Sequence, residues 1–243
     1  MDPRKDVIDE RLKGIKRIIS ITGGKGGIGK TSIATLLALQ LAEENYSVGL
    51  FDLDFSGPSA HLILNKHNFD FPEEENGIIP PIVNGVKFMT IVDYTKENPS
   101  PMRGVDVTNA ILEILAITRW DKMDFLVIDM PPGISDSALD IMKLIKRSEF
   151  LVAATPSKIS IPEVANTIKF LKNTDKAILG TVINMIMDGS ELLENKLDEL
   201  DIDIMAKIGY DKNYENAIGD VKKLLQTDFA EQVKELSKKI AKK

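Results

Sequence analysis

The sequence predicts an α/β protein with a doubly wound, mostly parallel sheet and helices on both faces. Two observations support this fold class. Short, almost wholly apolar runs recur along the chain, as in strands that are buried on both faces of a sheet. Longer segments with apolar residues at helical spacing separate these runs, so strands and helices alternate in the order of βαβ units with right-handed crossovers.

The elements follow in order along the chain. Predicted strands lie at residues 17–21, 48–51, 125–128, 150–154 and 178–183, and predicted helices at residues 31–44, 108–118, 136–146 and 162–172. Residues 77–91 break the alternation, because Asn84-Gly85 separates two apolar runs and predicts a β-hairpin on a sheet edge. No linker-like segment divides the chain, so we expect a single domain over residues 1–243, with a short surface helix in an N-terminal extension, residues 1–15.

An amphipathic helix is predicted at the C-terminus, over residues 226–243. Phe229, Val233, Leu236 and Ile240 fall on one face of this helix. The apolar stripe is narrow and acidic residues dilute the lysines, which is unfavourable for binding a lipid surface. We therefore expect this helix to pack on the protein's own surface rather than on a membrane.

The composition limits the possible partners and cofactors. A net charge of -6 and a pI near 5.1 disfavour a general attraction to nucleic acid or anionic lipid. No run approaches the roughly 18 apolar residues of a membrane span, and no signal segment is apparent, so we expect a cytoplasmic protein. The cysteine count of 0 excludes disulfides and thiolate ligands for zinc or an iron-sulfur cluster.

A phosphate-binding loop is predicted at residues 24–31, which read Gly-Lys-Gly-Gly-Ile-Gly-Lys-Thr and satisfy the pattern G-x-x-x-x-G-K-[ST]. The loop follows the first predicted strand and precedes the first strong helix. Its glycines allow main-chain N–H groups to curl around a phosphate, and the helix N-terminus adds positive partial charge. We expect Lys30 to neutralise β- and γ-phosphate oxygens and the Thr31 hydroxyl to ligate Mg²⁺, which together predict a P-loop NTPase fold.

Three aspartates are expected at the same edge of the sheet as this loop. Asp52 and Asp54 follow the second predicted strand, and Asp129 follows the third. Ligands bind open α/β sheets at the carboxyl ends of the strands, and Mg²⁺ prefers hard oxygen donors. We expect Asp52 and Asp54 to face the phosphate loop and Asp129 to hold Mg²⁺ through a water molecule.

Adenine is favoured over guanine as the base. Guanine-binding relatives usually carry an Asn-Lys-x-Asp stretch after a late strand, where the aspartate accepts hydrogen bonds from the base. Here residues 184–187 read Asn-Met-Ile-Met, with no lysine or aspartate in register. The expected ligands are therefore ATP and ADP.

Several motifs together resemble the Mrp/ApbC family of P-loop ATPases, within the MinD/ParA group. Lys25 gives the loop an extra lysine, as in the deviant Walker A motif of that group. The Gly57-Pro58-Ser59 stretch and the Asp129-Met130-Pro131-Pro132-Gly133 stretch separate Mrp/ApbC proteins from MinD and ParA proper. The matching stretches are residues 11–16, 25–31, 54–59, 85–91, 102–104, 124–136, 154–156 and 182–185.

The resemblance implies a homodimer that hydrolyses Mg-ATP held between the two protomers. Lys25 would reach the phosphates bound by the partner chain, Asp54 would orient or activate the attacking water, and Asn184 would contact the adenine. The loop of residues 131–136 would act as switch II. The implied catalytic residues are Lys25, Lys30 and Asp54, the metal-site residues are Thr31, Asp52 and Asp129, and the nucleotide-binding residues are Gly24, Lys25, Gly26, Gly27, Ile28, Gly29, Lys30, Thr31, Ser32, Asn184 and Asp211.

The chain departs from this family where an iron-sulfur cluster would be held. Mrp/ApbC proteins usually bridge a cluster across the dimer through a Cys-x-x-Cys pair, whereas residues 187–194 read Met-Asp-Gly-Ser-Glu-Leu-Leu-Glu. We therefore expect an ATP-driven switch that acts on an unidentified client protein without a bound cluster. Three alternatives stay open: a cluster carrier that uses a partner's or unusual ligands, a MinD/ParA-like organiser on membrane or DNA, and a small-molecule kinase or ligase.

Two further features are candidates for a dimer contact. They are the stretch Met102-Arg103-Gly104 and the single tryptophan, Trp120. A buried core anchor explains Trp120 equally well, because a large aromatic side chain contributes much apolar area to a core.

Overall fold

A computed structural model of the chain describes residues 2–67, 73–95 and 105–242. Met102-Arg103-Gly104 lies outside these described residues. An eight-stranded sheet forms the centre of the molecule, and a separate two-stranded sheet lies beside it. The eight strands are β1 (Ile15–Gly23), β2 (Val48–Asp52), β5 (Ile82–Val83), β6 (Val86–Thr90), β7 (Met123–Asp129), β8 (Ser148–Ala154), β9 (Ala177–Ile186) and β10 (Ile204–Gly209), and the small sheet contains β3 (Glu73–Glu74) and β4 (Ile78–Ile79).

The strand order in the large sheet is β10-β9-β8-β1-β7-β2-β6-β5. Every pair of neighbours is parallel except β5 and β6, which are antiparallel. From β1 the chain first crosses to β2 and β6 on one side, then returns to place β7 between β1 and β2, and then continues outward through β8, β9 and β10 on the other side. This arrangement confirms the predicted doubly wound, mostly parallel sheet, and it places the ligand edge at the carboxyl ends of β1, β2 and β7.

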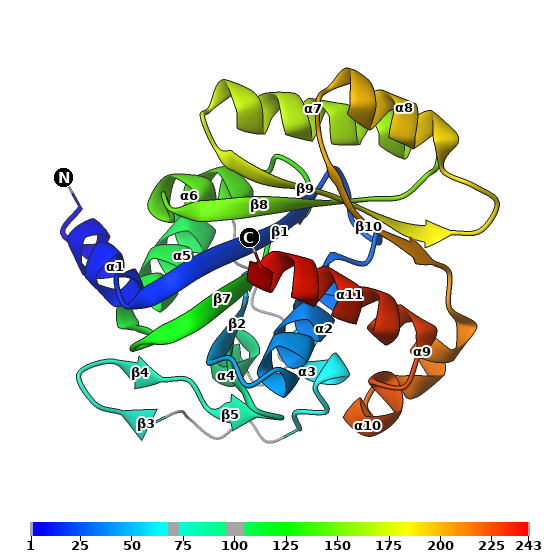
Figure 1. Ribbon diagram of the computed structural model, residues 1–243. Helices are drawn as coiled ribbons and strands as arrows, with labels where there is room; N and C mark the ends of the chain where they lie inside the picture. The colour runs from blue at the N-terminus through cyan, green and yellow to red at the C-terminus, as the bar shows by residue number, and fades with distance from the viewer. Residues whose placement is uncertain (1, 68–72, 96–104, 243) are drawn as a thin grey trace.

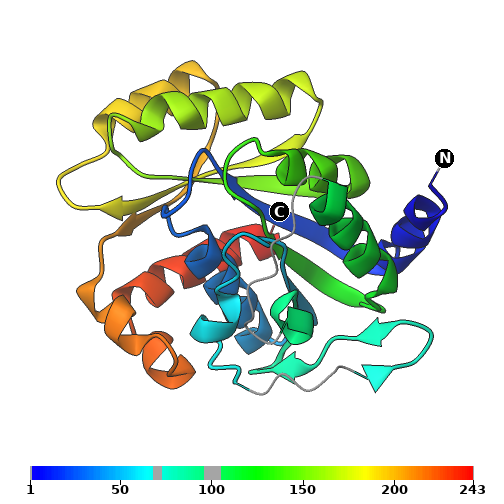
Figure 2. The same ribbon diagram turned by 180° about the vertical axis from the view of Figure 1, so that it is seen from behind.

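Helices cover both faces of the sheet (Figures 1 and 2). One buried apolar cluster includes side chains of α1, α5, α6, α7 and α8, and a second includes side chains of α2, α3, α9, α10 and α11. The helices are α1 (Arg4–Leu12), α2 (Lys30–Glu43), α3 (Ala60–Ile63), α4 (Val92–Thr95), α5 (Val105–Ile117), α6 (Asp136–Leu144), α7 (Ser160–Asn173), α8 (Glu191–Glu199), α9 (Lys212–Ala217), α10 (Val221–Leu224) and α11 (Asp228–Lys242).

The strands are longer than the apolar runs that predicted them, and β8 begins at Ser148, before its predicted run of residues 150–154. Ser20 in the middle of β1 is fully buried, and its hydroxyl lies 2.6 Å from the hydroxyl of Ser148 at the start of β8. A hydrogen bond between neighbouring strands offsets the cost of burying the two hydroxyl groups.

The predicted edge hairpin is present as β5 and β6, with β5 at the edge of the large sheet, whereas Ile78 and Ile79 of the same predicted segment pair with β3 in the small sheet. The hairpin's two-residue turn consists of Asn84 and Gly85, whose φ angles are 50° and 82°. Positive φ at both turn residues is the geometry of a type I′ turn, which matches the twist of the two strands. Asn84 also donates its side-chain N–H to the carbonyl of Leu64 at 2.9 Å, which ties the turn to the segment after α3.

Both terminal helices are attached through apolar side chains. α1 buries Ile8 and Leu12 and packs on α5, while α11 packs on α2 and β10 with the four predicted apolar residues, Phe229, Val233, Leu236 and Ile240, buried. Within the described ranges, no helix has both the length and the apolarity that crossing a bilayer requires. Trp120 is fully buried, and its ring centroid lies 5.1 Å from that of Phe51. The interpretation of this residue as a core anchor is therefore confirmed.

Candidate active site

The predicted phosphate loop connects β1 to α2 at the carboxyl edge of the sheet. Gly27 and Gly29 have φ angles of 73° and 84°, in the left-handed region where a Cβ atom would be strained. α2 begins directly afterwards at Lys30. The free N–H groups of the first helical turn therefore face the same edge as the glycine-rich loop, which is the arrangement that binds phosphates.

Two other segments hold this loop in place. Asn184, at the carboxyl end of β9, donates its Nδ2 hydrogen to the Ile28 carbonyl at 2.9 Å. The Gly133 amide, in the predicted switch II loop, donates to the Gly23 carbonyl at 3.0 Å. A movement of the segment after β7 would therefore be transmitted directly to the start of the phosphate loop.

The predicted metal residues lie together at the ends of neighbouring strands. Asp52 on β2 and Asp129 on β7 are opposite each other in the sheet register, and both are fully buried. The Thr31 hydroxyl donates to Oδ2 of Asp129 at 2.5 Å. Lys30 is only 5% exposed, so its positive charge is held within the site.

The electrostatics of this cluster favour a bound cation. Burial raises the pKa of Asp129 to about 7, against the Thr31 hydrogen bond and the Lys30 charge, which lower it. Burial and the negative charge of Asp129 also raise the pKa of Asp52. Oδ1 of Asp129 is buried without a hydrogen-bond partner among the described residues. An unpaired carboxylate oxygen beside a hydroxyl oxygen fits Mg²⁺, so Thr31, Asp129 and Asp52 are the residues that would hold it.

Asp54 lies just beyond the end of β2, on a loop that Asp52 anchors. Asp52 accepts hydrogen bonds from the Asp54 amide at 3.2 Å and from the Ala60 amide, at the start of α3, at 3.3 Å. Asp54 itself is half-buried and accepts from the Ser56 amide at 3.2 Å and the Ser56 hydroxyl at 2.5 Å. Its negative charge also contributes to raising the pKa of Asp129, which indicates that the two carboxylates are close enough to interact.

A cavity of about 250 Å³ lies against the phosphate loop, between Gly29 and Ser32 on one side and the β9 and β10 ends on the other. Asn184 lines it and is fully buried; its Oδ1 has no partner among the described residues. Tyr214 and Phe229 form an aromatic part of the wall, with ring centroids 4.6 Å apart. The cavity has the polar and apolar surfaces that a nucleotide base requires.

Sequence reasoning missed Tyr214 and Phe229 as cavity residues. The sequence pattern places Phe229 on the apolar face of the C-terminal helix, and no local pattern singles out Tyr214. Asp211 brings the two together: its carboxylate accepts from the Asn213 amide at 2.8 Å and from the Phe229 amide at 3.1 Å. Asp211 thus lines the cavity, as proposed, while both of its oxygens cap the starts of α9 and α11.

Lys25 lies on the exposed part of the loop. Its side chain is half-buried, and within the part of the chain that the structure describes it forms no ion pair. The described residues also contain no group of three or more His, Cys, Asp or Glu side chains arranged to hold a metal ion. A cation fits beside the unpaired Oδ1 of Asp129 and the Thr31 hydroxyl, where nucleotide phosphates could supply further oxygen ligands.

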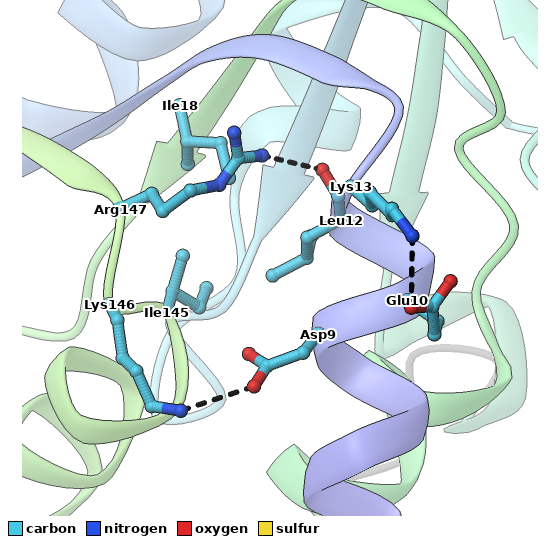
Figure 3. A pocket seen from close by; sticks show the side chains of 8 residues that line it. All are labelled: Asp9, Glu10, Leu12, Lys13, Ile18, Ile145, Lys146 and Arg147. Carbon is cyan, nitrogen blue, oxygen red and sulfur yellow. Dashed lines mark hydrogen bonds and ion pairs between the residues drawn. The ribbon is translucent and has the colours of Figure 1, made fainter.

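A second cavity, of about 400 Å³, lies near α1 and the start of β8 (Figure 3). Its charged side chains pair with one another: Lys146 with Asp9 at 3.1 Å, and Lys13 with Glu10 at 3.3 Å. Arg147 donates to the Leu12 carbonyl at 2.7 Å. The Lys146–Asp9 pair and the Arg147 hydrogen bond attach α1 to the segment before β8, and the described lining of this cavity offers no cluster of unpaired polar atoms comparable with the phosphate loop.

Comparison with known proteins agrees with this geometry. A family model of the ParA group, described as the NUBPL iron-transfer P-loop NTPase, matches residues 14–243. The chain belongs to this family. The resemblance to Mrp/ApbC proteins within the MinD/ParA group is thereby confirmed.

The relatives of this NUBPL-type chain carry names from iron-sulfur biology. An iron-sulfur cluster carrier protein of Rickettsia felis is 35% identical over 176 residues, which is 72% of this chain and 55% of that protein. A cytosolic Fe-S cluster assembly factor NUBP2 homolog of Culex quinquefasciatus is 35% identical over 182 residues, covering 72% of this chain and 71% of that protein. The chain spans about half the length of the rickettsial relatives that it matches.

Solved structures support the fold of this NUBPL-type chain. A nucleotide-binding protein of Archaeoglobus fulgidus in complex with ADP matches with a TM-score of 0.78 and 26% identity, over 90% of this chain and 92% of that one. The septum site-determining protein MinD of Pyrococcus horikoshii with Mg-ADP matches with a TM-score of 0.69 and 22% identity, over 93% and 96% of the two chains. The P-loop NTPase fold predicted from the sequence is thus confirmed.

Proposed function

We propose that this NUBPL-type protein is a Mg²⁺-dependent ATPase that works as a homodimeric switch on a client protein. The observation that carries the proposal is the convergence of Lys30, Thr31 and Asp129 beside the glycine-rich loop. Family membership and the ADP-bound and Mg-ADP-bound structural neighbours support nucleotide binding. We place its action in the cytoplasm, in line with the cytosolic assembly factors among its relatives.

The cavity beside the loop supports adenine as the base. Asn184 uses Nδ2 to hold the Ile28 carbonyl, so the group it offers to a ligand is the acceptor Oδ1. The exocyclic amine of adenine can donate to an acceptor, whereas the corresponding O6 of guanine would oppose it with a second acceptor. A buried polar group left unpaired is costly, so this position discriminates between the two bases.

In this proposal the site acts by positioning the attacking water and by stabilising the negative charge of the phosphates. Lys30 would neutralise the β- and γ-phosphates, and Lys25 would contribute a second positive charge to the phosphates of a partner protomer. Asp54 would orient the attacking water from its anchored loop. Mg²⁺, held by Thr31 and Asp129 with support from Asp52, would supply charge neutralisation on the phosphates.

Two substitutions test the proposal. Lys30→Ala should abolish ATP binding in isothermal titration calorimetry with Mg²⁺, because a buried charge facing the phosphates is lost. Asp54→Ala should retain ATP while turnover falls by about 10² to 10⁴, the usual contribution of a group that positions or deprotonates the nucleophile. Turnover by Asp54→Ala at the unmodified rate would remove Asp54 from the mechanism, and absence of ATP binding by the unmodified chain would overturn the proposed function.

Iron-sulfur cluster transfer is a second candidate function, favoured by the names of the family and of its relatives. This chain contains 0 cysteines, so a cluster would need a partner's thiolates or other ligands. Anaerobic reconstitution with iron and sulfide, followed by iron counting and absorbance, separates the candidates. A stoichiometric cluster on the purified chain would support the carrier function, and its absence would restrict this chain to the ATP-driven part of such a system.

A further inference from the structure

Two cavities meet at the amino edge of the sheet, where β1, β7 and β8 begin. The cavity of about 400 Å³ in Figure 3 and a further cavity of about 500 Å³ share Glu10 and Lys13, at the end of α1. The phosphate loop follows the other end of β1, whose 9 residues span about 30 Å. We call the two cavities together the amino-edge groove.

Direct contacts join the three chain connections that form this groove. A Cβ atom at Gly14, between α1 and β1, would lie 2.7 Å from the carbonyl oxygen of Asp121, between α5 and β7. Arg147, between α6 and β8, donates to the carbonyls of Leu12 and Ile15 at 2.7 and 3.1 Å. The groove is therefore one continuous surface, built from segments far apart in the sequence.

The groove has an excess of positive charge, although the whole chain has a net charge of -6. Its basic lining residues are Arg11, Lys13, Arg119, Lys122, Lys146 and Arg147, and its acidic ones are Asp9, Glu10 and Asp121. Three ion pairs use all three acidic residues: Lys13–Glu10, Lys146–Asp9 and Arg119–Asp121. Within the described residues, Arg11, Lys122 and Arg147 form no ion pair.

Helix ends account for only part of this excess. The groove lies at the C-termini of α1 and α5, where Arg147 donates to the Leu12 carbonyl and Arg11 donates to the Ala116 carbonyl at 3.1 Å. Each helix C-terminus carries about half a negative charge, so neither cation is fully compensated. Lys122 is exposed and makes no side-chain hydrogen bond within the part of the chain that the structure describes. The surface is therefore complementary to a partner that carries several negative charges.

The floor of the groove is apolar. Leu12, Ile18 and Ile145 line the smaller cavity and are 4%, 2% and 1% exposed. Figure 3 shows Leu12 and Ile145 between the Lys146–Asp9 pair at one end and Arg147 at the other. Nucleic acid binds mainly through its phosphates and would leave such a floor unused. A protein segment with both acidic and aliphatic side chains would use the cations and the floor together.

We propose that the amino-edge groove binds an acidic segment of a partner protein. Its carboxylates would lie beside Arg11, Lys122 and Arg147, and an aliphatic side chain would cover the apolar floor. A partner bound here would leave the nucleotide site open, because the two sites lie at opposite edges of the sheet. The inference rests on the proposed function only in offering a surface for its client, since binding at the groove requires no nucleotide.

The first experiment reverses single charges in the groove. The probe is a fluorescein-labelled peptide of four Glu-Glu-Leu repeats, titrated by fluorescence anisotropy at low salt without nucleotide. Lys122→Glu and Arg147→Glu should each raise the dissociation constant about tenfold, because a carboxylate of the peptide then meets a like charge. Lys169→Glu is the matched control: Lys169 is an exposed lysine of α7 without an ion pair among the described residues, and its variant should bind as the unmodified chain does.

Circular dichroism checks the fold of each variant. Arg147→Glu loses two hydrogen bonds to the turn after α1, so Lys122→Glu decides the test should Arg147→Glu fail to fold. An unchanged dissociation constant in Lys122→Glu, or an equal loss in Lys169→Glu, would overturn the proposal.

The second experiment changes the probe. A peptide with glutamine in place of glutamate and a peptide with serine in place of leucine should each bind about tenfold more weakly, since one lacks the charges and the other the aliphatic side chains. Equal affinity of all three peptides would overturn the proposal, as would a DNA duplex that binds more tightly than the acidic peptide and is weakened by Lys122→Glu. A chain that binds Mg-AMPPNP but not the peptide would overturn the groove alone. A chain that binds the peptide but not Mg-AMPPNP would support the groove and contradict the proposed ATPase.

Discussion

Gly29 packs directly against Asn184. A Cβ atom at Gly29 would lie 2.2 Å from the Asn184 Nδ2 atom, the same atom that donates to the Ile28 carbonyl. The end of β9 therefore supports the phosphate loop through a contact that only glycine permits. Because Asn184 also lines the neighbouring cavity, one side chain connects the glycine loop to the cavity that we propose binds the base.

Gly29→Ala should disrupt this contact. The φ angle of 84° and the clash with Asn184 both oppose a methyl group, so we expect a loss of about 1–3 kcal/mol in the free energy of unfolding. ATP affinity should fall with it. Gly26→Ala is the matched control, because a Cβ at Gly26 meets nothing within 4 Å; its stability without nucleotide should stay within about 0.5 kcal/mol of the unmodified chain. Urea unfolding measures both, and equal stabilities for the two variants would contradict the packing argument.

Asn184→Ala should reduce the preference for adenine. Both nucleotides lose the support of the loop, but only ATP loses a hydrogen-bond acceptor matched to its base. The ratio of GTP to ATP dissociation constants should therefore fall by about tenfold, the effect of one buried hydrogen bond. Titration calorimetry with both nucleotides gives this ratio. A ratio that stays constant while both affinities fall would show that Asn184 acts only on the loop.

Asp129→Asn should lower magnesium-dependent turnover without lowering the stability of the fold. Asparagine can still accept from the Thr31 hydroxyl, and it removes a buried negative charge whose burial raises the pKa of Asp129 to about 7. We expect the melting temperature without Mg²⁺ to be at least that of the unmodified chain. Turnover with Mg-ATP should fall about 10- to 100-fold, as for a residue that holds a metal through water. A strongly lowered melting temperature without Mg²⁺ would contradict this account.

Lys66→Met should destabilise the protein far more than the double variant Lys66→Met/Asp93→Val. Lys66 forms an ion pair with Asp93 in which both side chains are buried, and it lies 5.4 Å from the centroid of the Phe88 ring. Removing one partner of a buried pair costs about 3–5 kcal/mol, whereas replacing both by apolar residues restores most of it. Chemical denaturation of the single and double variants checks this. A double variant as unstable as the single one would show that the pair contributes by more than charge compensation.

Tyr214 should make the free energy of unfolding fall as the pH rises through the alkaline range. Burial raises the pKa of its phenol from 10.0 to about 12. The folded state therefore binds the proton more tightly than the unfolded state, so this stabilisation is complete below pH about 10 and is lost as the pH rises towards 12. The fall in free energy of unfolding between pH 9 and pH 11 should be smaller in Tyr214→Phe. Absorbance at 295 nm should show one fewer late-titrating phenol among the 4 tyrosines; an identical titration would contradict the burial effect.

The sequence predicted the parts of the fold that local patterns determine. Apolar runs marked the inner strands because both of their faces are covered, and Asn84-Gly85 marked the hairpin because its turn requires positive φ. β10 was not predicted, since an edge strand with only Met205 and Ile208 fully covered lacks a continuous apolar run. α8 was also missed, because a short helix with two buried leucines and a mostly acidic surface gives a weak periodic signal.

The candidate site also has one part that local sequence patterns predict and one part that they do not. The loop glycines, Lys30 and Thr31 form one contiguous motif, and the aspartates follow strands whose ends a parallel sheet brings together, as Asp52 and Asp129 show. The base cavity depends instead on Tyr214 and Phe229, which approach each other because Asp211 caps two helices at once. A tertiary contact of this kind leaves no trace in local spacing.

The position of Phe229 gives the C-terminal helix a role beyond covering the sheet. α11 begins at Asp228, so its first turn supplies a wall of the cavity next to the phosphate loop, and the rest of the helix is attached to α2, which starts at that same loop. Anything that loosens the 15 residues of α11, such as a bulky fusion or proteolytic trimming, would open the proposed nucleotide pocket from the outside. The packing of α11 should therefore affect how tightly this cavity holds a bound nucleotide.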